Sequence, residues 1–308
     1  MNDPAERLHY GKPIQELPKA RPRTNWFKYV CAGLLVLLIA TAGVGALYQA
    51  IETGRDRSSN PPPGKLVDVG GCRMHLDCLG KGSPTVILDS GLSDSSLSWY
   101  QVQPEVAKFT RVCSYDRAGL GWSASSPLPR NSGVCVDELH TLLHKAGIEA
   151  PFVLVGHSMG GYDVRLYASR FHSEVAGMVL VDSTYPDYAI WLPQLRSSLN
   201  AWSRQLRRQE YLMPFGLPRL MGWCGVGPPE LRSQLRTIEC NVKRLRETLA
   251  ECSSVWDASA AQVRATGTLG DIPLVVISED PGKNTKEFLS KFEEGQQLSL
   301  VYRLTAST

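Results

Sequence analysis

The most pronounced hydrophobic segment of the sequence is an uncharged apolar run near the N-terminus. Residues 30–48 form a stretch of 19 residues without a charged side chain. A helix rises about 1.5 Å per residue, so this run nearly matches a bilayer core of about 30 Å. Trp26, Tyr29 and Tyr48 stand where interfacial aromatic residues are expected. The pattern therefore predicts a transmembrane helix over residues 26–50.

Charges around this run predict its orientation. Basic residues precede it at Lys19, Arg21, Arg23 and Lys28, whereas Arg55 and Arg57 follow it beside Glu52 and Asp56. The positive-inside rule then places residues 1–25 in the cytoplasm and the chain after Ala50 outside. A cleaved signal peptide is the alternative, with Val44-Gly45-Ala46 as a cleavage site. The long charged lead and long apolar run favour an uncleaved signal anchor, and export is expected either way.

After a polar linker over residues 51–64, short β-branched runs alternate with helical patterns. Strands are predicted at residues 66–69, 74–78, 84–88, 111–115, 152–155, 175–181 and 272–277, with helices over 134–146 and 162–171 and a helical stretch up to Lys108. Alternation of this kind indicates a parallel sheet covered by helices on both faces.

The alternation lapses between residues 185 and 269, where the pattern is mostly helical. Leu195, Leu199, Trp202 and Leu206 share one helix face, so this insertion is predicted to form a helical cap. Residues 191–250 hold ten Lys or Arg against four Glu, a net charge of +6. Such a surface suits an anionic lipid surface or an acidic substrate, and a solvated helical face is the alternative.

Composition narrows the class of protein. Hydrophobic residues make up 43% and charged residues 20% of the chain, which excludes a disordered chain and a multi-span membrane protein. The net charge of +3 is too small to indicate nucleic-acid binding. The sequence contains no phosphate loop, dinucleotide fingerprint or metal motif, so no cofactor and no metal site are predicted.

One motif carries chemistry. Gly156-His157-Ser158-Met159-Gly160 follows a predicted strand and precedes a predicted helix. This is the G-x-S-x-G pattern of a nucleophile elbow, in which a sharp turn exposes the serine hydroxyl above a sheet. Ser158 is therefore the predicted nucleophile.

Four stretches resemble the α/β-hydrolase superfamily: LDSGLSDSSLSW (88–99), YDRAGLGWS (115–123), VLVGHSMGG (153–161) and IPLVVISEDP (272–281). The resemblance spans residues 66 to about 280. It implies an α/β-hydrolase fold over residues 65–308, with a mostly parallel sheet, helices on both faces and a cap at about 185–269. One transmembrane helix would precede this domain.

The resemblance also implies roles for individual residues. Ser158 matches the nucleophile, and the backbone N–H groups of Leu92 and Met159 match the oxyanion-hole donors. Asp280 matches the acid of the triad, with Glu279 and then Asp182 as alternatives.

Two structural roles follow from the same resemblance. Asp116 and Arg117 match a turn after the fourth strand, where a buried ion pair is expected to fix the loop. The family's strand order makes the second and fourth strands neighbours, so Cys78 and Cys113 are the best disulfide candidates. Two separate buried thiols are the alternative. Seven cysteines lie beyond the predicted anchor, so at least one has no partner within the chain.

The sequence departs from the family pattern at the general base. The base should be a histidine after the last strand, yet none of the six histidines follows Asp280. Residues 298–304 could form that last strand, and the chain therefore resembles a C-terminally truncated hydrolase. His140 and His144 lie four residues apart without an HExxH pattern, so ordinary helix-surface roles are expected for them.

The sequence thus predicts a membrane-anchored serine hydrolase that acts on carboxylic esters through an acyl-enzyme on Ser158. Its partners would be a small-molecule ester and a membrane, and no nucleic acid. The alternative is a catalytically silent hydrolase module that binds a ligand or a partner. Amidase or perhydrolase chemistry would use the same residues and stays open.

Overall fold

The computed structural model describes residues 26–279 and 300–304. The predicted cytoplasmic tail and the triad candidate Asp280 lie outside the described residues. The chain divides into two compact units, residues 1–43 and 44–308.

Helix α1 spans Trp26–Ser59 and includes the whole predicted transmembrane segment. Among the described residues it is the one helix that is long and apolar enough to cross a membrane, with a mean hydropathy of 2.4 in its apolar window. The helix also continues through residues 51–59, which were expected to form a linker. Of the predicted linker, only residues 60–64, between α1 and the first strand, are therefore non-helical.

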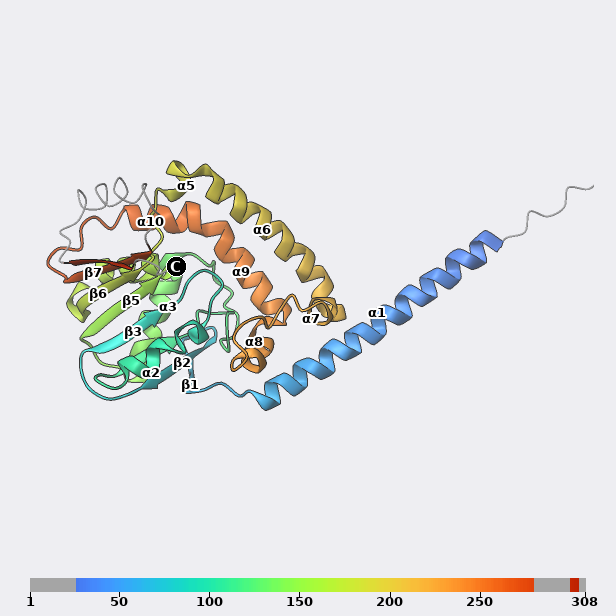
Figure 1. Cartoon of the computed structure of the whole chain (residues 1–308), viewed down its shortest axis with the longest axis horizontal. Coiled ribbons are helices and arrows are strands. Elements are labelled where there is room, and N and C mark those ends of the chain that lie inside the picture. Colours follow the sequence, from blue (N-terminus) through green and yellow to red (C-terminus); the bar gives the residue numbers. More distant parts are fainter. Residues whose placement is uncertain (1–25, 280–299, 305–308) are drawn as a thin grey trace, which may run out of the picture. The chain divides into compact units, whose positions relative to one another are not determined.

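An eight-stranded sheet forms the centre of the second unit, in the order β1-β2-β4-β3-β5-β6-β7-β8 (Figure 1). Its strands are β1 (Lys65–Asp68), β2 (Arg73–Leu79), β3 (Thr85–Asp89), β4 (Val112–Tyr115), β5 (Phe152–His157), β6 (Val175–Val181), β7 (Leu274–Glu279) and β8 (Leu300–Leu304). Strand β2 is antiparallel to β1 and β4, and all pairings from β4 to β8 are parallel. Every predicted strand is present, including the last one.

The helices beside the sheet are α2 (Val102–Val106), α3 (Ser132–Ala146) and α4 (Gly160–Arg170), with the 3₁₀ turns η1 (Ser96–Trp99) and η2 (His172–Glu174). Helix α3 begins where the Asn131 side chain accepts a hydrogen bond from the N–H of Val134. It ends at Gly147, whose φ of 69° suits a left-handed C-cap. The stretch expected to be helical up to Lys108 contains only η1 and the short α2.

The insertion between β6 and β7 is helical, as predicted. It contains α5 (Tyr188–Trp191), α6 (Pro193–Leu212), η3 (Met213–Phe215), α7 (Leu217–Leu220), α8 (Arg232–Glu239), α9 (Val242–Ser254), η4 (Val255–Ser259) and α10 (Ala260–Arg264). Helices α6 and α9 lie side by side (Figure 1). Trp202 and Leu206 of the predicted apolar stripe lie in their interface and pack with Leu245 and Leu249. Leu199 of the same stripe packs against the cluster that contains Met159.

Two disulfides tie elements of this unit together. Cys78 and Cys113 face each other across β2 and β4 and form the expected bond. Cys224 and Cys240 form a second bond within the cap, which the sequence analysis did not predict. The three remaining cysteines after α1, namely Cys72, Cys135 and Cys252, are buried and free.

His75 on β2 is fully buried between two acceptors. Its Nδ1 atom lies 2.8 Å from Asp116 Oδ2, and its Nε2 atom lies 2.6 Å from the carbonyl oxygen of Pro63. Burial alone would lower the pKa of His75, but the hydrogen bond and negative charge of Asp116 outweigh it and raise the pKa above 6.5. The protonated ring satisfies both acceptors.

This pair should make folding pH-dependent. Because the pKa of His75 is higher in the folded chain, its stabilising contribution is complete below about pH 6.5 and is lost as the pH rises through the raised pKa. His75→Gln should therefore flatten the decline in denaturant midpoint as the pH rises above about 6.5. His172→Gln, which changes an exposed histidine, should retain the wild-type decline. Equal declines in wild type and His75→Gln would refute this assignment.

Candidate active site

Ser158 occupies a strained turn between β5 and α4. Its φ angle is 49°, a left-handed conformation that non-glycine residues rarely adopt. A Cβ atom at Gly156 would lie 2.6 Å from the carbonyl oxygen of Gly160, and one at Gly160 would lie 2.6 Å from that of Asp89. Both positions therefore require glycine, as the motif predicts. The turn has the backbone geometry of a nucleophile elbow.

Backbone bonds fix this turn against the end of β6. The N–H of Ser158 donates to the carbonyl oxygen of Val181 at 3.1 Å, and the N–H of Thr184 donates to that of Ser158 at 3.0 Å. The Ser158 hydroxyl is half-buried and lies 3.4 Å from the Thr184 hydroxyl. Thr184 is thus a neighbour of the predicted nucleophile that the sequence analysis missed.

Both predicted oxyanion-hole donors are present near this turn. The Leu92 side chain packs against the cluster that contains Met159. Within the described part of the chain, the backbone N–H groups of Leu92 and Met159 have no acceptor. Stabilisation of an oxyanion requires two unpaired donors near the reacting group, and these two N–H groups are the ones that the sequence predicts for that role.

A buried guanidinium holds the loop that carries Leu92. The Arg117 side chain is 2% exposed, and its donors reach two carboxylates and two carbonyl oxygens. Its partners are Glu251 Oε1 at 2.7 Å, Asp89 Oδ1 at 2.9 Å, and the carbonyl oxygens of Ser90 at 2.7 Å and Gly91 at 2.5 Å. The last two residues directly precede Leu92, so Arg117 fixes the backbone just before the donor.

Cap helix α9 holds the other side of the same loop. Ser93 has a φ angle of 70°, and its N–H donates to Glu251 Oε2 at 2.8 Å. Its hydroxyl accepts hydrogen bonds from Arg244 at 2.8 Å and Thr248 at 3.0 Å. Leu92 therefore lies between a segment bound by Arg117 and a residue bound by the cap.

The network around Arg117 contains more carboxyl groups than basic groups. Burial lowers the pKa of Arg117, but the charges of Glu251 and Asp89 outweigh this effect and raise it. Burial raises the pKa of Asp89 to about 6, although Arg117 opposes the rise. Asp163 on α4 is fully buried, and burial together with the charge of Asp89 raises its pKa well above the ordinary value. The raised pKa of Asp163 favours its neutral form, which leaves Asp89 and Glu251 as the carboxylates that pair with Arg117.

The expected ion pair between Asp116 and Arg117 is not the one observed. Asp116 binds His75 and accepts hydrogen bonds from the N–H groups of Ser96 and Trp122. Arg117 binds Asp89 and Glu251. Successive residues on this turn therefore serve two different networks. The position of Asp89 directly after the predicted buried strand 84–88 could have indicated a functional carboxylate. Glu251 had no such indication in the sequence.

Of the three candidates for the acid of the triad, the structure describes the side chain of Asp182. Asp280 lies outside the described residues, and Glu279 ends β7 without a described side chain. Asp182 is exposed at the end of β6, with a φ angle of 42°. It directly follows Val181, the residue that accepts the hydrogen bond from Ser158, so its backbone lies beside the elbow.

The described histidines occupy other places. The His157 ring lies against Gly91 and edge-on to Trp99. His75 pairs with Asp116, His172 lies near Asp271, and His140 and His144 lie near Glu174. Within the described residues, the recorded contacts of Ser158 include no histidine.

A cavity of about 240 Å³ lies between the cap and residues 90–95, which we call the oxyanion loop after the predicted role of Leu92. Ser93, Asp94 and Ser95 line one side, and Leu231, Leu235 and Arg244 are among the cap residues that line it. Ser158 is not among its lining residues. The cavity therefore adjoins the far side of the loop.

Comparison with known proteins supports the fold and the family. A family model described as the alpha/beta hydrolase fold matches residues 84–234. The Cif epoxide hydrolase from Acinetobacter nosocomialis superimposes with a TM-score of 0.63 at 14% identity, covering 84% of this chain and 89% of that one. A loop variant of the haloalkane dehalogenase DbeA from Bradyrhizobium elkanii gives a TM-score of 0.61 at 19% identity, covering 78% and 88%.

The chain spans about half or less of the length of the curated relatives it matches. An uncharacterized protein of Schizosaccharomyces pombe is 28% identical in an alignment of 280 positions that covers 79% of this chain and 50% of the relative. An uncharacterized vacuolar membrane protein of Saccharomyces cerevisiae is 28% identical in an alignment of 133 positions that covers 37% of this chain and 21% of the relative. The sheet order, the elbow and the matched family model together show that the chain has the α/β-hydrolase fold.

Proposed function

We propose that the chain is a serine hydrolase that cleaves carboxylic esters through an acyl-enzyme on Ser158. The observation that carries this proposal is the elbow serine with unpaired backbone donors on its neighbour Met159 and on Leu92, whose side chain packs against the cluster that contains Met159. The α/β-hydrolase fold supports hydrolysis in general, and the serine supports this particular route.

The reaction would proceed in two steps. The Ser158 hydroxyl oxygen attacks the ester carbonyl carbon, and the N–H groups of Leu92 and Met159 stabilise the resulting oxyanion. The intermediate collapses, the alcohol leaves with a proton, and the acyl group remains on Ser158. Water then attacks the acyl carbon and releases the carboxylic acid, returning the proton to the serine oxygen.

Both steps need a general base. Triad enzymes that lack one member retain only about 10³–10⁴-fold catalysis over water. Asp280 remains the proposed acid, and the base remains unassigned because no histidine follows it in the sequence. Added imidazole can supply such a base from solution, which makes the proposal testable on this chain.

The test is labelling of Ser158 by a fluorophosphonate probe, which a reactive serine attacks at phosphorus. The purified full chain should be labelled, Ser158→Ala should abolish labelling, and Ser197→Ala on the exposed face of α6 should not. Imidazole above about pH 7 should accelerate labelling of the wild type by roughly tenfold or more. The readouts are in-gel fluorescence and peptide mass spectrometry.

Absence of labelling in a folded chain, with and without imidazole, would contradict the proposal. That outcome would support the silent binding module instead. Labelling that persists in Ser158→Ala would place the reactive group elsewhere.

We also propose that α1 anchors the hydrolase domain to a membrane, with residues 1–25 cytoplasmic and the domain outside. The two disulfides support an exported domain, because such bonds persist in oxidising compartments. The resemblance to a vacuolar membrane protein is consistent with membrane attachment.

An exposed apolar surface of the cap supports this anchoring. Phe215, Leu217, Leu220, Met221, Trp223 and Val226, which we call the cap apolar patch, have side chains 39–69% exposed. This segment lies against the part of α1 that ends the apolar run: a Cβ atom at Gly45 would meet the carbonyl oxygen of Phe215, and one at Gly216 would meet the Tyr48 ring. The patch therefore adjoins the point where the helix would leave the bilayer, and we propose that it contacts the same lipid surface.

Polar contacts hold α1 against the cap just beyond this point. Gln49 donates to the carbonyl oxygen of Cys240 at 2.8 Å, and Arg219 pairs with Asp56 at 2.5 Å. Both contacts are largely buried. They would fix the height of the patch relative to the membrane surface.

Fluorescence can test the patch directly. In full-length Cys31→Ser protein in phosphatidylcholine–phosphatidylglycerol vesicles, an environment-sensitive dye on Leu220→Cys should shift to the blue and be quenched by brominated lipid. The same dye on Phe109→Cys, in the turn between α2 and β4, should show neither change, although Phe109 is 75% exposed. Equal spectra at the two positions would refute contact between the patch and lipid.

A further inference from the structure

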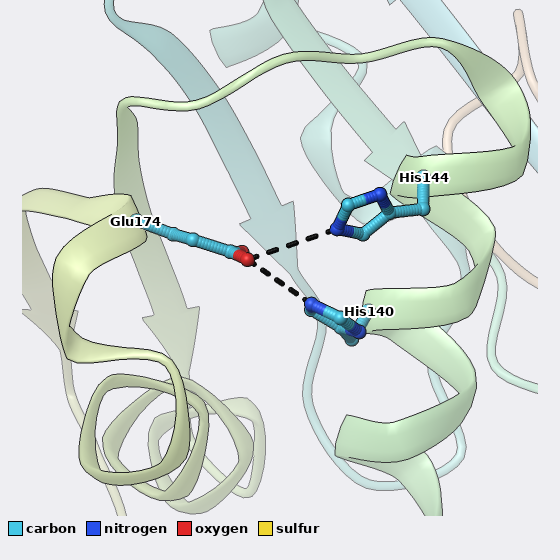
Figure 2. A group of neighbouring side chains, drawn as sticks. All are labelled: His140, His144 and Glu174. Carbon is cyan, nitrogen blue, oxygen red and sulfur yellow. Dashed lines mark hydrogen bonds and ion pairs between the residues drawn. The ribbon is translucent and has the colours of Figure 1, made fainter.

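Three metal-ligating side chains meet at the surface, away from the proposed active site. His140 and His144 lie one turn apart on α3, and Glu174 ends η2. The Glu174 Oε1 atom lies 3.1 Å from His140 Nε2 and 3.7 Å from His144 Nε2. Figure 2 shows both imidazole rings directed at this one carboxylate. One ligand atom from each residue lies within 4.8 Å of the others.

These separations suit a tetrahedral ion. Zinc binds imidazole nitrogen and carboxylate oxygen at about 2.0–2.2 Å, which places neighbouring ligand atoms about 3.4 Å apart. The two observed separations, 3.1 and 3.7 Å, lie on either side of that value. The third separation, between the two imidazoles, is within 4.8 Å, so small side-chain rotations would complete the geometry. The exposed side of His144 leaves room for a water as fourth ligand.

The ligands are also held by neighbouring side chains. The Tyr167 hydroxyl donates to Glu174 Oε2 at 2.6 Å, which leaves Oε1 facing the histidines. The His140 ring stacks on Phe171, with a centroid distance of 3.8 Å and an interplanar angle of 6°. Such outer contacts fix ligand orientation in established metal sites.

We infer that His140, His144 and Glu174 form a binding site for one divalent transition-metal ion, zinc being the best fit. Two imidazoles and one carboxylate suit zinc and disfavour magnesium, which prefers oxygen ligands. The sequence indicates only the two histidines, through their spacing on one helix. The third ligand, Glu174, lies 30 residues after His144.

The site's position implies a structural role. Glu174 directly precedes the first residue of β6, whereas Ser158 follows the last residue of β5, and these two strands are parallel. The cluster therefore lies at the N-terminal ends of these strands, and the elbow lies at their C-terminal ends. A bound ion would link α3 to the connection between α4 and β6 and take no part in hydrolysis.

Calorimetry with zinc chloride on the tag-free, metal-stripped full chain tests this site. One zinc ion per chain should bind, and magnesium should not. His144→Ala should weaken zinc binding tenfold or more, and since His144 is 67% exposed the variant should fold. His172→Ala removes another exposed histidine, which lies near Asp271, and should bind zinc like the wild type.

Two further measurements separate a built site from chance binding. Zinc should raise the Tm of the wild type and of His172→Ala, but not of His144→Ala. Tyr167→Phe should weaken zinc binding about tenfold, because Glu174 loses its orienting donor. No zinc binding by the wild type, or equal affinities in His144→Ala and His172→Ala, would overturn the inference.

Discussion

The buried guanidinium of Arg117 is the contact on which the proposed active site depends. Removing a charge from water is expensive, so Arg117 can stay buried only because Asp89 and Glu251 both pair with it. Breaking such a buried pair from one side typically costs about 3–5 kcal/mol. Since Asp89 ends β3 and Glu251 belongs to cap helix α9, this one side chain connects the sheet, the oxyanion loop and the cap. The position of the Leu92 N–H follows from that connection.

This arrangement explains how an insertion outside the sheet can matter for chemistry at the elbow. Helix α9 supplies Glu251, Thr248 and Arg244 to Ser93, whose strained backbone would otherwise favour another conformation. The same cap contacts the end of α1 through the ion pair between Arg219 and Asp56. The Cys224–Cys240 disulfide closes the cap segment that follows Arg219. Contacts within this unit thus run from the end of the apolar run of α1 to the loop beside Ser158. Under the proposed anchoring, contacts of the cap would connect the end of α1 to the proposed active site.

Much of the fold was predictable from sequence because its signals are local. The buried strands, the elbow and the stripe through Leu206 are each encoded in neighbouring residues, and Cys78–Cys113 followed from the family's strand order. Glu251 and Glu174 were not predictable, since each acts on residues remote in sequence that only tertiary structure brings near. The helix through residues 51–59 was not predicted, because these polar residues are held by contacts with the cap that the sequence does not reveal, such as the ion pair between Asp56 and Arg219.

Amide hydrogen exchange of the oxyanion loop tests the central claim most directly. Glu251→Gln keeps the size of the side chain but removes its charge, so the carboxylate that binds both Arg117 and the Ser93 N–H is lost. Exchange of the hydrogen-bonded amides of Ser93 and Asp94 should then accelerate at least tenfold, while β3 and β5 stay protected. Glu247→Gln, one turn earlier on α9 and also buried, should leave exchange of the loop unchanged. Unchanged loop exchange in a folded Glu251→Gln protein would contradict the account, because the loop would then be held without the cap.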